Sequence, residues 1–213
     1  VLLCGEPGIG KSRITRALRE RVAGEPHVRL RYQCSPFHAN SALHPVIEQF
    51  ERAAAFARDD SAEQKLDKLE ALLREGDADI SATAPLIATL LSLPAGRYPA
   101  LSYSPQKQKE KTLEALSAQV EGLSAKSPVL MMFEDLHWVD PTTQEALDLI
   151  VSRLAQHRVL LVATYRPEYS ARWIGQPHVT VINLSRLSRR VGEQMIRQVA
   201  GEKRLPGEVL EQI

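Results

Sequence analysis

Eight residues near the amino end combine glycines, a lysine and a serine at a spacing that suits phosphate binding. The segment fits G-x-x-x-x-G-K-[ST] at every fixed position and reads Gly5-Glu6-Pro7-Gly8-Ile9-Gly10-Lys11-Ser12. Glycines let backbone N–H groups close around phosphate oxygens. In this pattern the lysine reaches the β and γ phosphates of a nucleotide, and the serine hydroxyl holds Mg²⁺. Arg13 follows directly and is close enough in sequence to reach a phosphate.

The residues on both sides of this segment favour phosphate binding over a purely structural glycine turn. The apolar run Val1–Cys4 predicts a strand that leads into the segment. After it, Ile14, Leu18 and Val22 recur at helical spacing, and Gly24 ends the pattern. The positive amino-terminal end of that helix would point at the same anion.

A pair of acids follows a second apolar run. Val129–Phe133 predicts a buried strand that ends in Glu134 and Asp135. Hydrolysis of a bound triphosphate needs one acidic group to hold Mg²⁺ and another to orient or deprotonate water. By position we assign Glu134 to the Mg²⁺ shell and Asp135 to the attacking water, and the reverse assignment stays open. The simpler alternative is a strand end with two solvated carboxylates, which the phosphate-binding segment in the same chain argues against.

A third polar point follows the apolar run Val159–Ala163, where the chain continues to Arg166. Ligands of open α/β sheets bind beyond the carboxyl ends of the strands, so a guanidinium here could touch the γ-phosphate and stabilise transition-state charge. The alternative is a surface arginine paired with Glu168. We interpret His137, next to the acids, as a structural histidine.

Helices alternate with strands along the rest of the chain. Val28–Cys34 alternates arginine with apolar residues, which predicts an edge strand, and Val179–Leu184 is a fifth strand candidate. Two helices are expected from their caps: one after a capping box of Ser61 and Gln64, and one after Asp140. Four more are expected from Pro45 to about Ala57, from Ala84 to Leu93, around Leu113 to Leu123, and from Arg189 to Ala200. This order predicts an α/β fold with a doubly wound parallel sheet and a helical insert between its second and third strands.

Composition sets broad limits. The chain has 213 residues and a net charge of +1, so bulk charge does not indicate nucleic-acid binding. No apolar run reaches the ~20 residues of a membrane span, and no signal peptide is visible. Two cysteines suit a reducing cytoplasm. The absence of an initiator methionine and the end within a helical pattern lead us to expect an excised piece of a longer protein.

The stretches Glu134-Asp135-Leu136-His137-Trp138-Val139-Asp140 and Thr164-Tyr165-Arg166-Pro167-Glu168 resemble the STAND branch of the AAA-type P-loop ATPases. The chain is most similar to the ATPase module found beside adenylate or guanylate cyclase domains and tetratricopeptide repeats in bacterial signalling proteins. The resemblance implies a five-stranded sheet of order 5-1-4-3-2, a core over residues 1–186, and the start of a truncated helical lid over 187–213. That order separates Cys4 from Cys34 by about 14 Å, too far for a disulfide, so two free thiols are expected.

The resemblance also implies a function: a regulatory switch that binds ATP or ADP with Mg²⁺ and hydrolyses ATP slowly. Its partners would be the nucleotide, other domains of the same chain (cyclase, tetratricopeptide or winged-helix) and, with ATP, further copies in an oligomer. No arginine finger can be assigned, and adenine and guanine stay open. A module that holds nucleotide without turnover is one alternative. A DNA-linked AAA ATPase is another, although no basic DNA-binding domain lies within these residues.

Overall fold

Five parallel strands form one sheet at the centre of the molecule. The computed structural model describes residues 1–76, 78–94, 96–187, 191–192 and 194–195. The strand order is β2-β3-β4-β1-β5, which confirms the expected order 5-1-4-3-2. All four strand pairings are parallel. The strands are β1 (Leu2–Cys4), β2 (Val28–Gln33), β3 (Val129–Glu134), β4 (Val159–Tyr165) and β5 (Val181–Asn183).

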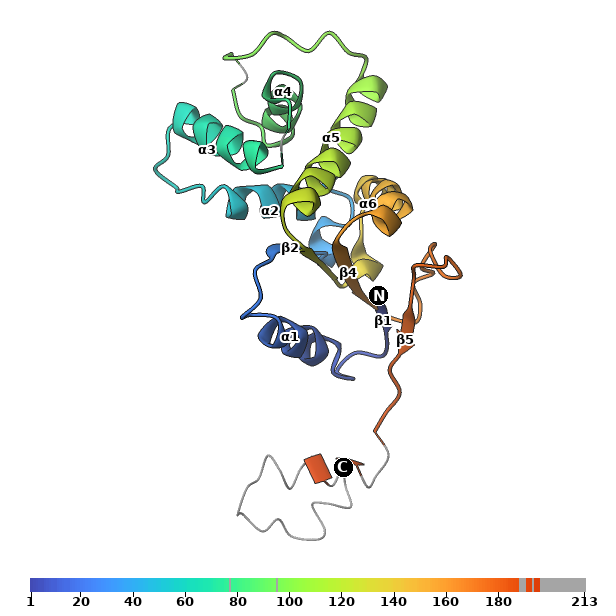
Figure 1. The fold of residues 1–213 in the computed structure, drawn as a ribbon. Coiled ribbons are helices and arrows are strands. Elements are labelled where there is room, and N and C mark those ends of the chain that lie inside the picture. Colours follow the sequence, from blue (N-terminus) through green and yellow to red (C-terminus); the bar gives the residue numbers. More distant parts are fainter. Residues whose placement is uncertain (77, 95, 188–190, 193, 196–213) are drawn as a thin grey trace.

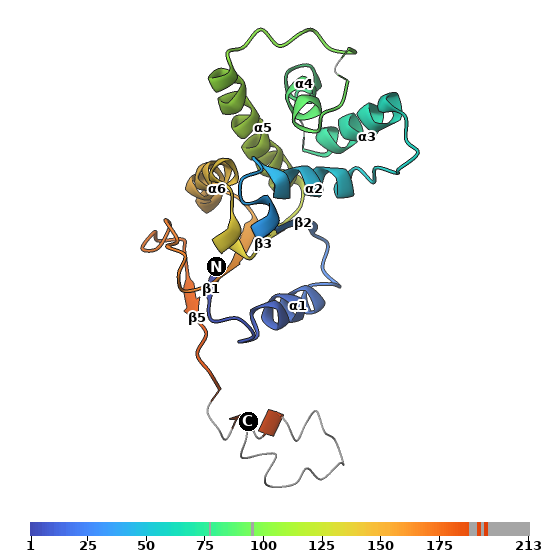
Figure 2. The same cartoon turned by 180° about the vertical axis from the view of Figure 1, so that it is seen from behind.

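Helices cover both faces of the sheet, as expected (Figure 1). They are α1 (Lys11–Arg21), α2 (His44–Ala53), α3 (Ala62–Glu75), α4 (Ile80–Leu90), α5 (Pro105–Lys126) and α6 (Pro141–Arg153). Figures 1 and 2 show α1 on one face, with α2, α5 and α6 on the other and α3 and α4 stacked beyond them. The insert between β2 and β3 therefore adds a second helical layer to one side of the molecule.

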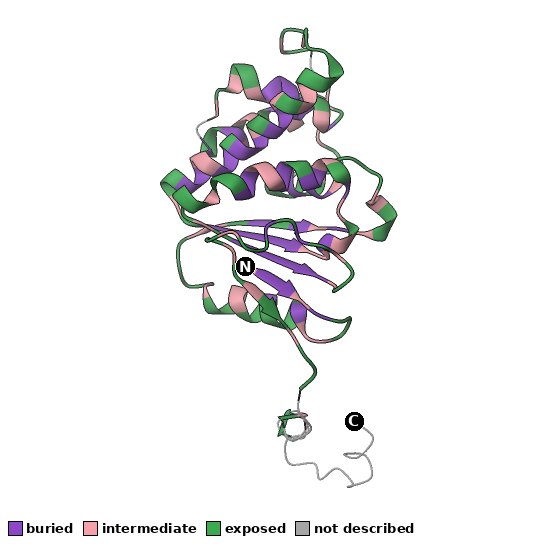
Figure 3. Ribbon diagram, turned by 90° about the vertical axis from the view of Figure 1, so that its right-hand side faces the viewer, coloured by how far each residue is buried: buried purple, intermediate pink, exposed green. Residues whose placement is uncertain are grey.

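Burial along the strands follows their place in the sheet (Figure 3). In β3, every residue from Val129 to Phe133 is buried, because helices lie on both faces. In β2, Leu30 and Tyr32 are buried while Arg29 and Arg31 face solvent. This alternation fits an edge strand with one covered face, as the sequence predicted.

The open edge of β2 is blocked by side chains of α2. The backbone N–H of Arg31 donates to Oε1 of Gln49 at 2.9 Å, and the guanidinium of Arg52 donates to the carbonyl of Arg31. These bonds satisfy backbone groups that would otherwise be free to pair with another chain. They also fix the backbone of Arg31.

The helical insert differs from expectation at two helix ends. The capping box holds, because Ser61 Oγ accepts from the N–H of Gln64 at 3.2 Å and Gln64 Oε1 accepts from the N–H of Ser61. The helix expected to run to about Ala57 instead ends at Ala53, and Ala55 adopts a left-handed conformation with φ 51°. The helix expected from Ala84 begins at Ile80, because Asp79 caps it, and contains Pro85 in its interior.

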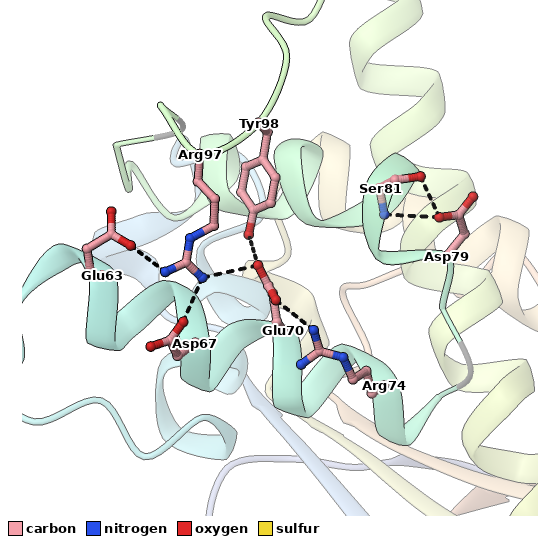
Figure 4. A network of polar contacts seen from close by, with 8 residues as sticks. All are labelled: Glu63, Asp67, Glu70, Arg74, Asp79, Ser81, Arg97 and Tyr98. Carbon is pink, nitrogen blue, oxygen red and sulfur yellow. Dashed lines mark hydrogen bonds and ion pairs between the residues drawn. The ribbon is translucent and has the colours of Figure 1, made fainter.

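An arginine fastens the loop before α5 to α3 (Figure 4). Arg97 donates to Asp67 at 2.6 Å and to Glu70 at 3.2 Å, and it also pairs with Glu63. The hydroxyl of Tyr98 donates to Glu70 at 2.8 Å. These contacts tie the segment before α5 to one face of α3.

Helix α1 covers its face of the sheet only in part. Leu18 and Val22 pack against a small cluster formed by Leu3, Leu130, Met132 and Val162. Ile14, from the same apolar stripe, is 41% exposed. Cys4 and Cys34 are free thiols, as expected. The helix expected from Arg189 and most of the lid segment 187–213 lie outside the described residues.

Candidate functional site

The loop between β1 and α1 has the backbone that the glycine pattern predicted. Gly8 and Gly10 have φ values of 76° and 107°, a region that side chains disfavour. A Cβ built on Gly5 would lie 2.8 Å from Cγ2 of Ile9 and 3.1 Å from Cβ of Leu184. Gly8 and Gly10 are therefore required by their backbone conformation, and Gly5 is required by the close approach of neighbouring atoms. The loop also passes close to the chain that follows β5.

Lys11 lies at the start of α1 with its ammonium folded onto the loop. The residue is 8% exposed, and Nζ donates to the carbonyls of Gly5 at 2.5 Å and Glu6 at 3.0 Å. Ser12 and Arg13 are exposed. The Arg13 guanidinium lies 3.6 Å from Glu20 of the same helix, so its side chain extends along the helix in this structure.

The amino-terminal end of α1 suits an anion. The helix has no side-chain cap at Gly10 and no acidic residue in its first turn. The first N–H groups of a helix have no acceptor within it, and the helix dipole places partial positive charge at that end. A phosphate above the loop would receive both contributions.

Glu134 ends β3 on the face that α1 covers. Met132, two residues earlier, packs in the cluster beneath α1, and side chains on a strand alternate between faces. The Glu134 carboxylate accepts from Nε of Arg31 on the neighbouring strand at 2.9 Å. Its side chain is 13% exposed, against 45% for Arg31. Sequence reasoning did not find this arginine.

Asp135 leaves β3 in a left-handed conformation, with φ 58° and ψ 45°. Its Oδ2 accepts from the Gln33 amide at 2.9 Å, and its N–H donates to the Thr164 hydroxyl at 3.0 Å. Gln33 ends β2 and Thr164 lies near the end of β4, so both neighbours of β3 hold this residue. Neither was chosen from the sequence, although each sits beside a strand end, which is where ligands of such sheets bind.

Arg166 follows β4 at the same edge of the sheet. Its side chain is 36% exposed, and its guanidinium lies 3.9 Å from Glu168. This is the pair expected if Arg166 is only a surface arginine, and its distance is near the upper limit for an ion pair. A single exposed pair of this kind holds a side chain weakly.

His137 sits in the short 3₁₀ turn η2 (Leu136–Trp138), which packs against β4. Both ring nitrogens are buried, and neither has a hydrogen-bond partner among the described residues. Burial, and then the positive charge of Arg166, lower the pKa of His137. The centroids of the His137 and Trp138 rings are 5.1 Å apart, and the ring planes are tilted by 46°. The ring therefore lacks the hydrogen bonds that a satisfied structural histidine would make within the described residues.

Comparison with known proteins agrees with this geometry. The AAA ATPase domain family matches residues 1–162, which is more than half of the chain. The chain belongs to the AAA ATPase domain family. An uncharacterized protein of Rhizobium meliloti (strain 1021) is 30% identical to this AAA domain over 184 residues, which are 86% of the chain and 18% of that protein. The chain thus spans about a fifth of the length of this relative.

The residues of this AAA domain fit the nucleotide and metal that the family implies. Gly8 and Gly10, the loop glycines with positive φ, have nothing within 4 Å of a built Cβ, so the loop offers open room beside its N–H groups. A serine hydroxyl and a carboxylate are oxygen ligands of the kind that Mg²⁺ takes, usually together with phosphates and water. The described residues contain no group of three or more His, Cys, Asp or Glu side chains placed to hold a metal without such help.

Family membership makes this AAA domain a nucleotide-binding module of the ATPase type. Strand β4 lies between β1 and β3, as the strand order implied by the resemblance placed it. Within the described part of the chain, no helix combines the length and apolarity needed to cross a bilayer.

Proposed function

We propose that this domain binds ATP and ADP with Mg²⁺, hydrolyses ATP slowly, and serves as a STAND-type regulatory switch in a larger protein. One observation carries the proposal. The phosphate loop follows β1 and the Glu134–Asp135 pair follows β3, both at the carboxyl ends of the parallel strands, with only β4 between those two strands. Two strand spacings are about 10 Å, a span that a triphosphate and its hydrated metal can bridge.

Binding is assigned to the loop and the start of α1. The loop comprises Gly5, Glu6, Pro7, Gly8, Ile9, Gly10, Lys11 and Ser12, with Arg13 beside it. Lys11 would leave the carbonyls of its own loop and turn to the β and γ phosphates. Ser12 and Glu134 would hold Mg²⁺, which when bound offsets phosphate charge. Glu134 suits this role because it projects to the face that carries α1.

Hydrolysis is assigned to Asp135 with help from Arg166. A water oxygen would attack the γ-phosphorus as the bond to the bridging oxygen breaks, and Asp135 would orient this water and take its proton. The Gln33 amide donates to Asp135, and the Thr164 hydroxyl accepts from the Asp135 N–H. These two bonds hold Asp135 in a left-handed backbone conformation that is uncommon outside glycine. The Arg166 guanidinium would stabilise the charge on the transferring phosphoryl group.

Slow turnover is supported by what the key groups already bind. The Lys11 ammonium is engaged by loop carbonyls, and the Glu134 carboxylate is engaged by Arg31. Both must exchange partners before a catalytic complex forms. The same two contacts favour the second candidate, a module that holds nucleotide without turnover, and a sensitive phosphate-release assay separates the two.

The size of the relative supports a role inside a larger protein. This chain covers 18% of it, so most of that relative lies outside the matched segment. We propose that these include output domains of the cyclase, tetratricopeptide or winged-helix kind, that the ATP form favours oligomers, and that the protein works in the cytoplasm.

Thermal unfolding with Mg-ATP, Mg-ADP and Mg-GTP tests the binding part of the proposal. A ligand at 100 times its Kd should stabilise the folded domain by about 2.7 kcal/mol. Lys11→Ala should abolish the shift. Lys111→Ala, which removes a partly exposed lysine of α5 paired with Glu114, should keep it. No shift with any nucleotide in the wild-type domain would contradict the proposal.

A further inference from the structure

One polar side chain near the carboxyl ends of the strands, where the phosphate loop lies, has no hydrogen-bond partner among the described residues. The ring nitrogens of His137 are both buried, and the described residues supply neither an acceptor nor a donor to them. Buried polar atoms in folded proteins are almost always hydrogen-bonded, and each exception calls for a reason. Here the ring lies two residues beyond Asp135, at the edge where the phosphate loop lies.

The surroundings of this ring carry charge of both signs. Arg166 and Lys11 act on it as positive charges, while Asp135 and Glu168 act as negative ones. The Thr164 hydroxyl accepts from the N–H of Asp135 at 3.0 Å, which anchors the start of η2 to the end of β4. The turn closes on itself as the N–H of Trp138 donates to the carbonyl of Asp135 at 2.9 Å. The histidine is therefore held on a fixed turn among the residues assigned to catalysis.

The chemistry of the ring indicates what completes it. A neutral imidazole offers one donor and one acceptor. Arg166 and Lys11 can donate but cannot accept, so they do not satisfy the N–H of the ring. An anionic oxygen brought in by a ligand would accept from it, and the two cations show where such an anion is favoured.

We propose that His137 recognises the γ-phosphate: one ring nitrogen donates to a γ-phosphate oxygen, so that the domain binds triphosphate more tightly than it would without this side chain. The inference rests on the proposed function of the site. ADP has no γ-phosphate oxygen and therefore cannot supply this acceptor to the ring. A histidine that serves only packing would show no preference between the two nucleotides.

Calorimetric titration of the whole domain with a non-hydrolysable ATP analogue and with ADP, each with Mg²⁺, tests this role. His137→Ala should weaken triphosphate binding on the order of tenfold and leave ADP binding unchanged. His137→Gln, which keeps a donor, should recover part of the loss. An equal loss for both nucleotides, or no loss for either, would overturn the proposal.

A second histidine provides the matched control. The Nδ1 atom of His157 lies 3.2 Å from the Ser124 hydroxyl, beyond the opposite end of β4. His157→Ala should keep the ratio of triphosphate to diphosphate affinity. Without nucleotide, His137→Ala should lower the melting temperature only slightly, because within the described residues it breaks no hydrogen bond and loses only packing such as that against Trp138. A lower melting temperature with an unchanged affinity ratio would make His137 a packing residue.

These outcomes separate the two proposals. A wild-type domain that binds neither nucleotide contradicts the proposed function and this inference with it. A wild-type domain that binds both nucleotides, with an unchanged affinity ratio in His137→Ala, contradicts only the inference.

Discussion

Glu134 and Arg31 form an ion pair of 2.9 Å between adjacent strands, although they are 103 residues apart in sequence. The pair joins the carboxylate proposed for Mg²⁺ to an edge-strand arginine whose backbone is fixed by α2. A guanidinium and a metal ion compete for the same carboxylate oxygens. The arginine therefore sets how readily Glu134 is released to the metal.

Replacing Arg31 should lower the Mg²⁺ requirement. In Arg31→Met, the concentration of Mg²⁺ that gives half-maximal binding of a fluorescent ATP analogue should fall several-fold. Stability should change by no more than about 1 kcal/mol, because the arginine is 45% exposed. Arg29→Met, two residues away on the same face and also exposed, is the control and should match wild type. A raised Mg²⁺ requirement in Arg31→Met would show that the pair helps to build the metal site.

Gly5→Ala should damage the phosphate loop. The added methyl would meet Cγ2 of Ile9 at 2.8 Å and Cβ of Leu184 at 3.1 Å. Such overpacking costs about 1–3 kcal/mol, and the displaced loop should bind nucleotide more weakly. Gly24→Ala, with nothing within 4 Å of its Cβ, should leave both unchanged. Chemical denaturation and nucleotide titration measure the two effects, and equal behaviour of the variants would contradict the geometry.

Asp140 should contribute more stability than an ordinary helix cap. It is 1% exposed and accepts from the N–H groups of Thr142, Thr143 and Leu43, so it joins α6 to the start of α2. Asp140→Ala should cost about 2–4 kcal/mol, since it removes a cap and leaves buried donors unpaired. Asp79→Ala removes the exposed cap of α4 and should cost only about 1 kcal/mol. Similar urea midpoints for the two variants would show that burial adds nothing here.

The two thiols should differ in reactivity. Cys34 is 2% exposed. Burial, with the nearby charges of Asp140 and Asp135, raises the pKa of Cys34 to about 12, so almost no thiolate forms at neutral pH. Iodoacetamide should modify Cys4, which is partly exposed, well before Cys34 in the folded domain. Mass spectrometry of the labelled protein measures the order, and rapid labelling of Cys34 would mean that its surroundings open readily.

Strong local signals explain which parts of the fold the sequence predicts. The fully apolar run of β3 and the alternation of β2 each report a position in the sheet. Helix α4 begins four residues before the expected start because the Asp79 side chain caps it, and Pro85 lies inside the helix. Strand β5 is shorter than its apolar run, since only Val181–Asn183 pair with β1.

The candidate site divides in the same way. The phosphate loop and the acids follow from spacing, because each is a continuous segment beside a strand. The contacts of Arg31 with Glu134 and of Gln33 with Asp135 join residues more than a hundred positions apart, and strand order alone brings them together. Likewise, only the folded surroundings show that the His137 ring nitrogens have no hydrogen-bond partner within the part of the chain that the structure describes.

Phosphate release from ATP by wild-type and Asp135→Asn domains is the most direct test of the account. Both proteins should bind Mg-ATP with the same Kd, because asparagine has nearly the size of aspartate and can keep the contacts with Gln33 and Thr164. Wild type should release phosphate slowly, and Asp135→Asn should release it at least about a hundredfold more slowly, since it cannot take the proton of the attacking water. Equal, measurable rates of phosphate release from the two proteins would contradict the assignment of the attacking water to Asp135.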